Sequence, residues 1–268
     1  MMKISKNTDI MRVLEEIKQI SGLLWSKGWA ESNAGNFSIN ITGLCKKIKF
    51  QIPESGYVRL NKTYKHLRNQ YILITCSGCR MRGIAVNPVQ GLCLLYFNKS
   101  GNAYTIISLD NISDKNPTSE LFTHLELQNL LAGKNTGEKV VLHTHPAEVI
   151  ALTNLKNFKS EKSINKLISA IQPEVPVLFP EGIGFISYQL TGSKKLALKT
   201  RKKFNKHKIV IWEKHGCVST GKDLNEAFDY TDVLIKTIKI FFLCLSSGNK
   251  TEGLNVYQVK ELKKLNKK

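Results

Sequence analysis

The stretch Val140-Val141-Leu142-His143-Thr144-His145-Pro146 joins a short apolar run to a pair of histidines. An apolar run of this length closed by proline predicts a buried strand. Side chains alternate across a strand, so residues two apart share a face. The sequence therefore predicts a strand whose end presents the imidazoles of His143 and His145 on one side.

A third histidine stands in a similar context. His215 follows the apolar run Ile209-Val210-Ile211-Trp212 and precedes Gly216. Two strand ends that each deliver imidazole can build a three-histidine metal site with open coordination positions, which is a catalytic arrangement. A single histidine at a strand end is more simply read as a hydrogen-bonded side chain, but the combination favours a metal site. Three imidazoles suit zinc and also iron, copper or nickel.

Composition predicts one domain with a substantial core. The chain has 268 residues, of which 42% are hydrophobic, and no repeat or flexible linker divides it. The most apolar stretch, 235–245, contains Lys236 and Lys239, so we expect no transmembrane helix. The N-terminus has no apolar signal core, and we expect a cytoplasmic protein.

The net charge of +19 raises nucleic acid as a possible partner. The lysines cluster at 194–208 and 260–268, and Phe204 is the only aromatic residue in either cluster. Stacking residues for bases are therefore lacking, and we expect neither nucleic acid nor membrane as a partner. A basic field would instead attract an anionic, phosphorylated substrate. Cys76 and Cys79 form a lone C-x-x-C pair, which predicts reduced thiols in a cytosolic chain.

The order of predicted elements indicates an α/β chain of the α+β type, with three layers: a central, mostly antiparallel sheet flanked by helices. We expect helices at 8–27, 118–131, 147–155, 163–171 and 224–246. We expect strands at 37–41, 71–75, 92–98, 104–109, 140–145, 175–179, 184–188 and 209–212. An insertion at about 45–70 and a basic tail at about 258–268 complete a single domain spanning 1–268.

Three turns rich in small residues can bring backbone N–H groups close to an anion. They are Asn33-Ala34-Gly35-Asn36, Ser77-Gly78 and Thr118-Ser119. Each is equally compatible with ordinary turn chemistry and helix capping. Glu120 follows the third turn, where a carboxylate complements the dipole of the predicted helix. The functional alternative is a general base beside a Lewis-acid metal, which acidifies a C–H next to a carbonyl.

Taken together, these motifs resemble the class II aldolase and adducin family between about Leu24 and Asp232. The matching segments are 27–36 (KGWAESNAGN), 75–78 (TCSG), 116–121 (NPTSEL), 143–146 (HTHP), 179–184 (FPEGIG) and 215–217 (HGC). The Lys27-Gly28-Trp29 start, the insertion before Ser77 and the turn at 179–182 are similar to the branch that acts on L-rhamnulose 1-phosphate.

The resemblance implies a role for each matching residue. Zinc, one ion per subunit, would be bound by His143, His145 and His215, and Glu120 would be the catalytic acid and base. The site that binds the substrate phosphate would be lined by Asn33, Gly35, Asn36, Ser77, Gly78 and Ser119. Glu174 would reach a neighbouring subunit's site within a homotetramer. The implied reaction is reversible cleavage to dihydroxyacetone phosphate and L-lactaldehyde.

Related reactions stay open at this point. Pentulose-phosphate epimerases, methylthioribulose-phosphate dehydratases and L-fuculose 1-phosphate aldolases resemble the chain in the same histidine pattern. Adducin head domains are non-enzymatic and have lost metal ligands, whereas all three histidines stand here. Cys76 and Cys79 depart from the Gly and Lys expected around the Ser-Gly pair, and the lysine-rich stretch 160–172 is also unusual.

Overall fold

The computed structural model describes residues 8–45, 50, 52, 56–107, 109, 115–248 and 252–265. These residues form a nine-stranded sheet in the order β2-β5-β4-β3-β1-β6-β9-β8-β7. The strands are β1 (Asn36–Asn40), β2 (Val58–Arg59), β3 (Tyr71–Thr75), β4 (Leu92–Phe97), β5 (Ala103–Ile107), β6 (Val140–Thr144), β7 (Gly184–Ile186), β8 (Ile209–Trp212) and β9 (Gly216–Gly221). Only β7 and β8 pair in parallel, so the predicted, mostly antiparallel sheet is confirmed.

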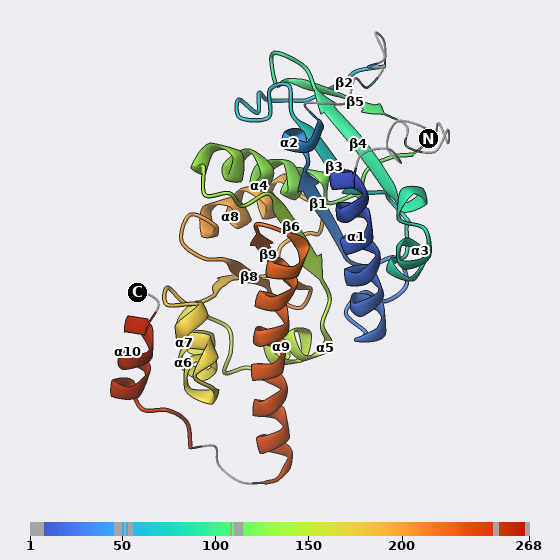
Figure 1. Cartoon of the computed structure of the whole chain (residues 1–268). Coiled ribbons are helices and arrows are strands. Elements are labelled where there is room, and N and C mark those ends of the chain that lie inside the picture. Colours follow the sequence, from blue (N-terminus) through green and yellow to red (C-terminus); the bar gives the residue numbers. More distant parts are fainter. Residues whose placement is uncertain are drawn as a thin grey trace.

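Helices cover both faces of the sheet, as Figure 1 shows. One face carries α1 (Thr8–Ser26), α3 (Met81–Val86), α5 (Ala147–Asn154), α6 (Glu161–Ile171) and α9 (Leu224–Ser246). The other carries α4 (Leu121–Lys134) and α8 (Lys194–Lys203). Strand alternation assigns the faces: Leu142 packs with the first group, whereas Val141 packs against α4 and α8. The expected three layers are therefore confirmed.

The start of α4 matters most for the site. Glu120 is the N-cap residue of this helix, and its side chain makes no capping hydrogen bond. The Thr118 hydroxyl accepts the Glu120 backbone N–H instead, at 3.3 Å. The carboxylate of Glu120 is therefore free to face away from its own helix, toward the end of β6.

The structure has helices α3 and α8 and strand β9 where no element was expected, and it differs from expectation in two further segments. Residues 175–179 were expected as a strand, but Glu174–Leu178 is the short helix α7. An apolar run this short carries no periodicity that separates strand from buried helix. The basic tail includes a helix, α10 (Val256–Leu265), which lies beside α7 in Figure 1. The last residues of that tail, 266–268, lie outside the described residues.

The expected insertion at about 45–70 is described in part, because residues 46–49, 51 and 53–55 lie outside the described ranges. The segment includes the short α2 (Thr42–Cys45) at its start and contributes β2 to the sheet edge. Tyr64 and Leu67 from this segment are buried in a core cluster that also contains Leu125 of α4. The segment therefore packs against the helix that begins at Glu120.

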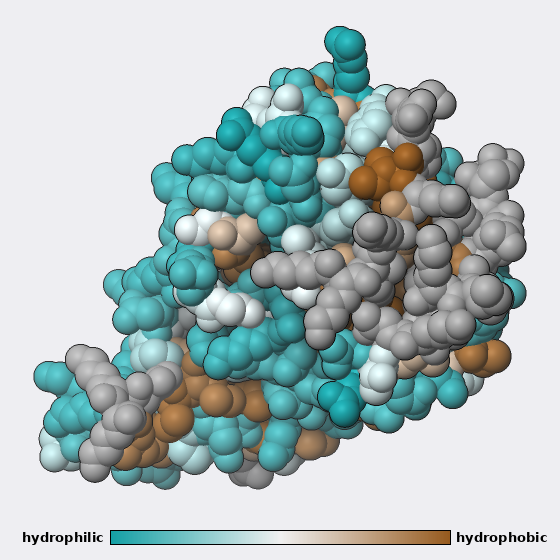
Figure 2. Space-filling model, turned by 45° about the horizontal axis from the view of Figure 1, so that its top comes forward, coloured by the Kyte–Doolittle hydropathy of each residue, from teal (hydrophilic) through white to brown (hydrophobic). Residues whose placement is uncertain are grey.

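The surface is mostly hydrophilic, as the lysine content predicts. Figure 2 shows this on one face, with hydrophobic surface gathered mainly toward one lower edge. Large exposed hydrophobic side chains near the end of the chain are Leu243, Leu245, Val256, Tyr257 and Leu265. In the described parts of the chain, every helix is too short or too polar to cross a bilayer.

Candidate active site

Nearly all the predicted site residues line one cavity of about 410 Å³. It opens where β1, β6 and the start of α4 meet. Its lining includes Asn33, Gly35, Asn36, Ser77, Gly78, Ser119, Glu120, His143, His145 and His215. Residues separated by more than a hundred positions are thus brought together, because β1 and β6 pair so that Asn36 stands opposite His143.

The three histidines converge at one end of this cavity. Each offers a ring nitrogen, and these atoms lie within 4.8 Å of one another. The Nε2 atoms of His143 and His145 are 2.8 Å apart. His143 is the last but one residue of β6, His145 follows that strand, and His215 lies in the turn between β8 and β9. Within the described residues, they form the one cluster of three or more ligand-type side chains.

Partners outside the triad orient two of the rings. The carbonyl of Cys217 accepts the Nδ1–H of His143 at 2.9 Å, which leaves Nε2 as the free lone pair. His145 Nδ1 lies 3.4 Å from a carboxylate oxygen of Glu31. The Nδ1 atom of His215 is buried and has no hydrogen-bond partner among the described residues.

Burial keeps these imidazoles neutral. It lowers the pKa of His143 well below the usual value, and proximity to His145 and His215 lowers it further. Burial also lowers the pKa of His145, and that of His215 to about 4. Neutral imidazole is the form that binds a metal, so the triad has the required protonation state at neutral pH.

A close backbone contact sets the spacing between β6, which carries His143, and the start of β9, which follows His215. A Cβ atom at Gly216 would lie only 2.1 Å from the carbonyl oxygen of Thr144. No side chain fits in that gap, so residue 216 must be glycine for the backbone of β9 to approach β6 this closely. His215 is therefore fixed against the end of the strand that carries His143.

Glu120 lies directly beside the triad. Its carboxylate oxygens are 3.3 Å from His143 Nε2 and 3.7 Å from His215 Nε2. The side chain is buried, and Oε2 has no hydrogen-bond partner in the described structure. Burial raises the pKa of Glu120 to about 7, while a hydrogen bond from the Asn36 side chain opposes that rise. A carboxyl group with this pKa can both give and take a proton near neutral pH.

The rim of the cavity includes residues of the three predicted turns. Gly35 and Gly78 have φ angles of 75° and 73°, a region that favours glycine. The backbone N–H of Ser77 is already donated to the Asn116 carbonyl at 2.8 Å. The groups still available to bind an anion are therefore the hydroxyls of Ser77 and Ser119, the Asn33 amide and neighbouring backbone N–H groups.

Some predicted and unpredicted residues fall elsewhere. Glu174 is exposed at the start of α7 and is not among the residues that line the cavity. Thr191 does line it, although no motif pointed to this residue. The neighbouring Gly192 lies so close to the Ser119 carbonyl that a Cβ would be 3.0 Å from it. The loop before α8 thus closes over the start of α4.

The C-x-x-C pair lies under the same rim. Cys76 lines the cavity, and its Sγ atom is 2.9 Å from that of Cys93 in β4. A hydrogen bond with Cys79 lowers the pKa of Cys76, but a hydrogen bond with Cys93 and burial outweigh it and raise that pKa to about 12. A thiol with that pKa stays protonated, so Cys76 is a poor nucleophile and a poor metal ligand at neutral pH.

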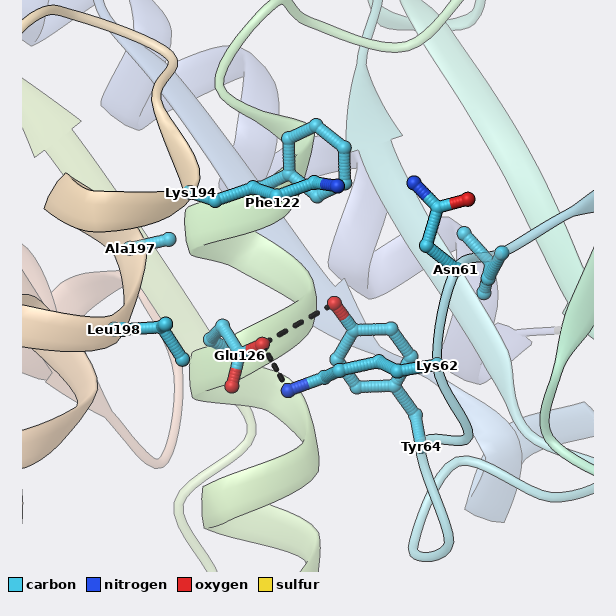
Figure 3. A pocket seen from close by; sticks show the side chains of 9 residues that line it. Asn61, Lys62, Tyr64, Phe122, Glu126, Lys194, Ala197 and Leu198 are labelled. Carbon is cyan, nitrogen blue, oxygen red and sulfur yellow. Dashed lines mark hydrogen bonds and ion pairs between the residues drawn. The ribbon is translucent and has the colours of Figure 1, made fainter.

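A second cavity, of about 210 Å³, lies on the other side of α4 (Figure 3). Its walls come from the segment after β2, from α4 and from α8. The buried Glu126 of α4 binds Lys62, and Tyr64 donates a hydrogen bond to the same carboxylate at 3.3 Å. None of the predicted site residues lines this cavity. These contacts tie the expected insertion to the helix that presents Glu120.

Comparisons with known proteins agree with this geometry. Residues 15–242 match the family model of the Class II Aldolase and Adducin N-terminal domain. The rhamnulose-1-phosphate aldolase of Bacteroides thetaiotaomicron is 33% identical over 254 residues, which cover 94% of this chain and 93% of that protein.

Solved structures give the same fold. A sugar-phosphate aldolase from Thermotoga maritima superposes with a TM-score of 0.76 and 32% identity, covering 91% of this chain and 99% of that one. An L-fuculose 1-phosphate aldolase superposes with a TM-score of 0.61 and 16% identity, covering 96% of each chain. The second similarity concerns the fold alone.

Proposed function

The chain belongs to the class II aldolase and adducin family, and from this premise we propose that it cleaves L-rhamnulose 1-phosphate reversibly to dihydroxyacetone phosphate and L-lactaldehyde. The observation that carries the proposal is the convergence of three neutral imidazoles and one buried carboxyl group on a single cavity. The choice of ketose rests on the 33% identical relative named for that reaction.

The donor set fits a divalent metal ion. His143, His145 and His215 would hold it, and we propose zinc, one ion per subunit. When bound, the ion would act as a Lewis acid on the ketose oxygens and lower the energy of the negative charge that develops next to the carbonyl. The tautomer of His143 supports this assignment, because its Nδ1–H is donated to the Cys217 carbonyl and its Nε2 is left as the possible ligand atom.

Glu120 would carry the proton transfer. In the cleavage direction, the C4 hydroxyl gives its proton to water as its oxygen becomes the aldehyde carbonyl, the bond between C3 and C4 breaks, and the electron pair of that bond stays on C3, next to the ketose carbonyl. The Glu120 carboxyl then donates a proton to that carbon, and in the synthetic direction the carboxylate removes it. A pKa of about 7 lets the same group act in both directions.

The rim would bind the phosphate. The hydroxyls of Ser77 and Ser119 and the amide of Asn33 belong to residues that line the cavity together with the histidines. Gly78 leaves its surroundings open, because no heavy atom lies within 4 Å of the place where a side chain would begin. The net charge of +19 would also raise the local concentration of a phosphorylated substrate.

We further propose a homotetramer in which Glu174 completes the cavity of a neighbouring copy. Glu174 is exposed at the start of α7 and lies outside its own cavity, as this role requires. Substitution Glu174→Ala should then lower activity without changing the metal content. Complementation in mixed tetramers of Glu174→Ala and Glu120→Gln subunits would restore part of the activity. A complete lack of complementation would argue against a shared site.

The main experiment measures dihydroxyacetone phosphate release from L-rhamnulose 1-phosphate, with L-fuculose 1-phosphate in parallel. We expect release from the rhamnulose ester, loss of that release with a chelator, and recovery with added zinc. Release of dihydroxyacetone phosphate from the fuculose ester instead would mean that the proposed substrate is wrong. Release from neither ester by the metal-loaded protein would refute the proposed aldolase activity. An epimerase or dehydratase would then be tested by product analysis, because neither reaction produces dihydroxyacetone phosphate.

A further inference from the structure

A row of buried polar side chains runs beneath the cavity between β1 and α4. It contains Gln128 and His124 of α4, and Ser38 and Asn36 of β1, and all four are at least nine-tenths buried. No sequence motif singled out the first three. Buried polar groups of this kind must satisfy one another, because water does not reach them.

The direction of each hydrogen bond in this row is fixed from its far end. The Gln128 amide lies 3.1 Å from two backbone carbonyls, those of Ser38 and Lys139, and it can only donate to them. Its NH₂ group shares two hydrogens among three acceptors, the third being the Ser38 hydroxyl oxygen at 2.9 Å, and an amide nitrogen cannot accept a hydrogen bond from that hydroxyl. That hydroxyl accepts from Gln128 and keeps its own hydrogen for His124 Nδ1, 2.8 Å away.

The same direction continues to the cavity. With Nδ1 accepting, the proton of the neutral His124 ring lies on Nε2. This Nε2–H is 2.6 Å from Asn36 Oδ1 and donates to it. The carbonyl end of the Asn36 amide is thereby held toward His124, and its NH₂ end is turned to the cavity. Asn36 and Glu120 line the same cavity, and the Asn36 side chain lowers the pKa of Glu120, as an NH₂ group turned toward a carboxylate does.

We propose that His124 is a positioning residue, which holds the Asn36 amide with its NH₂ group turned to Glu120 and so fixes the carboxyl group that moves the proton. The inference rests on the proposed function of Glu120 and adds a residue that does not line the cavity. His124 is a buried ring in the first turn of α4, and its partners are in the central strand β1. The row therefore transmits a fixed orientation from the sheet backbone to the reacting group.

A double-mutant cycle tests this coupling in the metal-loaded, full-length protein. His124→Phe keeps a flat ring but removes both nitrogens, and Asn36→Ala removes the amide that His124 holds. We expect His124→Phe to lower kcat by about 10- to 100-fold, the cost typical of a misplaced catalytic group. In the Asn36→Ala background, His124→Phe should lower kcat almost no further, because the amide that His124 orients is already absent.

Two further variants separate positioning from general damage. His124→Gln retains a donor near the Nε2 position and should recover part of kcat relative to His124→Phe. Leu131→Ala makes a cavity in the same helix, away from the row, and should lower stability while leaving kcat within about twofold of wild type. Equal losses of kcat from His124→Phe in both backgrounds would overturn the proposal. A loss confined to KM would do the same.

A spectroscopic measurement keeps this inference separate from the choice of reaction. Nitrogen NMR of ¹⁵N-histidine-labelled wild type, with His124 assigned from the His124→Gln spectrum, reports which ring nitrogen carries the proton. We expect protonated Nε2 and unprotonated Nδ1, and the reverse would overturn the proposal even in an active enzyme. Inactivity of wild type on every ester, with the expected tautomer present, would refute the proposed function and leave the oriented Asn36 amide in place.

Discussion

Acid should destabilise this protein through His124, and the size of the effect follows from its burial. Burial lowers the pKa of His124 to about 3 in the folded protein, from an ordinary value of 6.5. Between these values, the unfolded chain binds a proton at this position and the folded chain does not. The contribution of the neutral His124 to the free energy of unfolding is therefore fully present above about pH 6.5. As the pH falls below that value, this contribution is lost by about 1.4 kcal/mol per pH unit.

Between about pH 7.5 and pH 5 the expected loss is about 2 kcal/mol, since about 1.5 units of that interval lie below the ordinary pKa. Urea unfolding of wild type and His124→Gln at both pH values, with a chelator present, measures it. The chelator makes the three site histidines contribute alike to both proteins. The substitution should cost stability at the higher pH, and its cost should shrink by about 2 kcal/mol at the lower one.

The control is His66→Gln, which replaces an exposed imidazole and shows how far the exchange of imidazole for an amide by itself alters stability. Parallel pH dependences for wild type and His124→Gln would refute the reasoning. That result would mean that His124 is protonated in the folded state, and the hydrogen-bond directions drawn from Ser38 to Asn36 would then be wrong.

Three more substitutions follow from the site. Glu120→Gln should retain the metal, measured by elemental analysis, and lose about 10²- to 10⁴-fold in kcat, the usual contribution of a general acid or base; a folded, metal-loaded variant with wild-type kcat would contradict the assigned role. His143→Ala should lose bound metal and activity together, whereas retained metal would exclude this residue as a ligand. Gly216→Ala should lower the free energy of unfolding by at least about 1 to 3 kcal/mol, measured in urea, because its Cβ would overlap the Thr144 carbonyl; unchanged stability and metal affinity would disprove the tight contact.

The strong periodic signals in the sequence predicted the main elements. The strand that bears His143 and the long helix over 224–246 both occur with the expected bounds to within a residue or so. In contrast, β9 was not predicted, because its sequence GCVSTG contains glycines and small polar residues rather than an apolar alternation. Position in the centre of the sheet, and not propensity, makes this segment a strand.

The cavity lining was largely predictable because its residues occur in short motifs. The buried row beneath it was not, because His124 is paired with residues 86 and 88 positions away in the sequence. In the sequence, His124 is one histidine within a helical pattern, and nothing local distinguishes it from a surface residue. Only the packing of α4 on β1 identifies its partners.

The close approach of Gly216 to Thr144 has a consequence for how this protein could be altered. This main-chain contact sets the distance between the side chains of His143 and His215. Either histidine could therefore be replaced by another metal-binding side chain of similar length without a change in the backbone. A single inserted residue within β9 would instead turn every following side chain to the opposite face of the sheet. Sequence drift in this part of the gene should therefore tolerate new side chains more readily than any change in length.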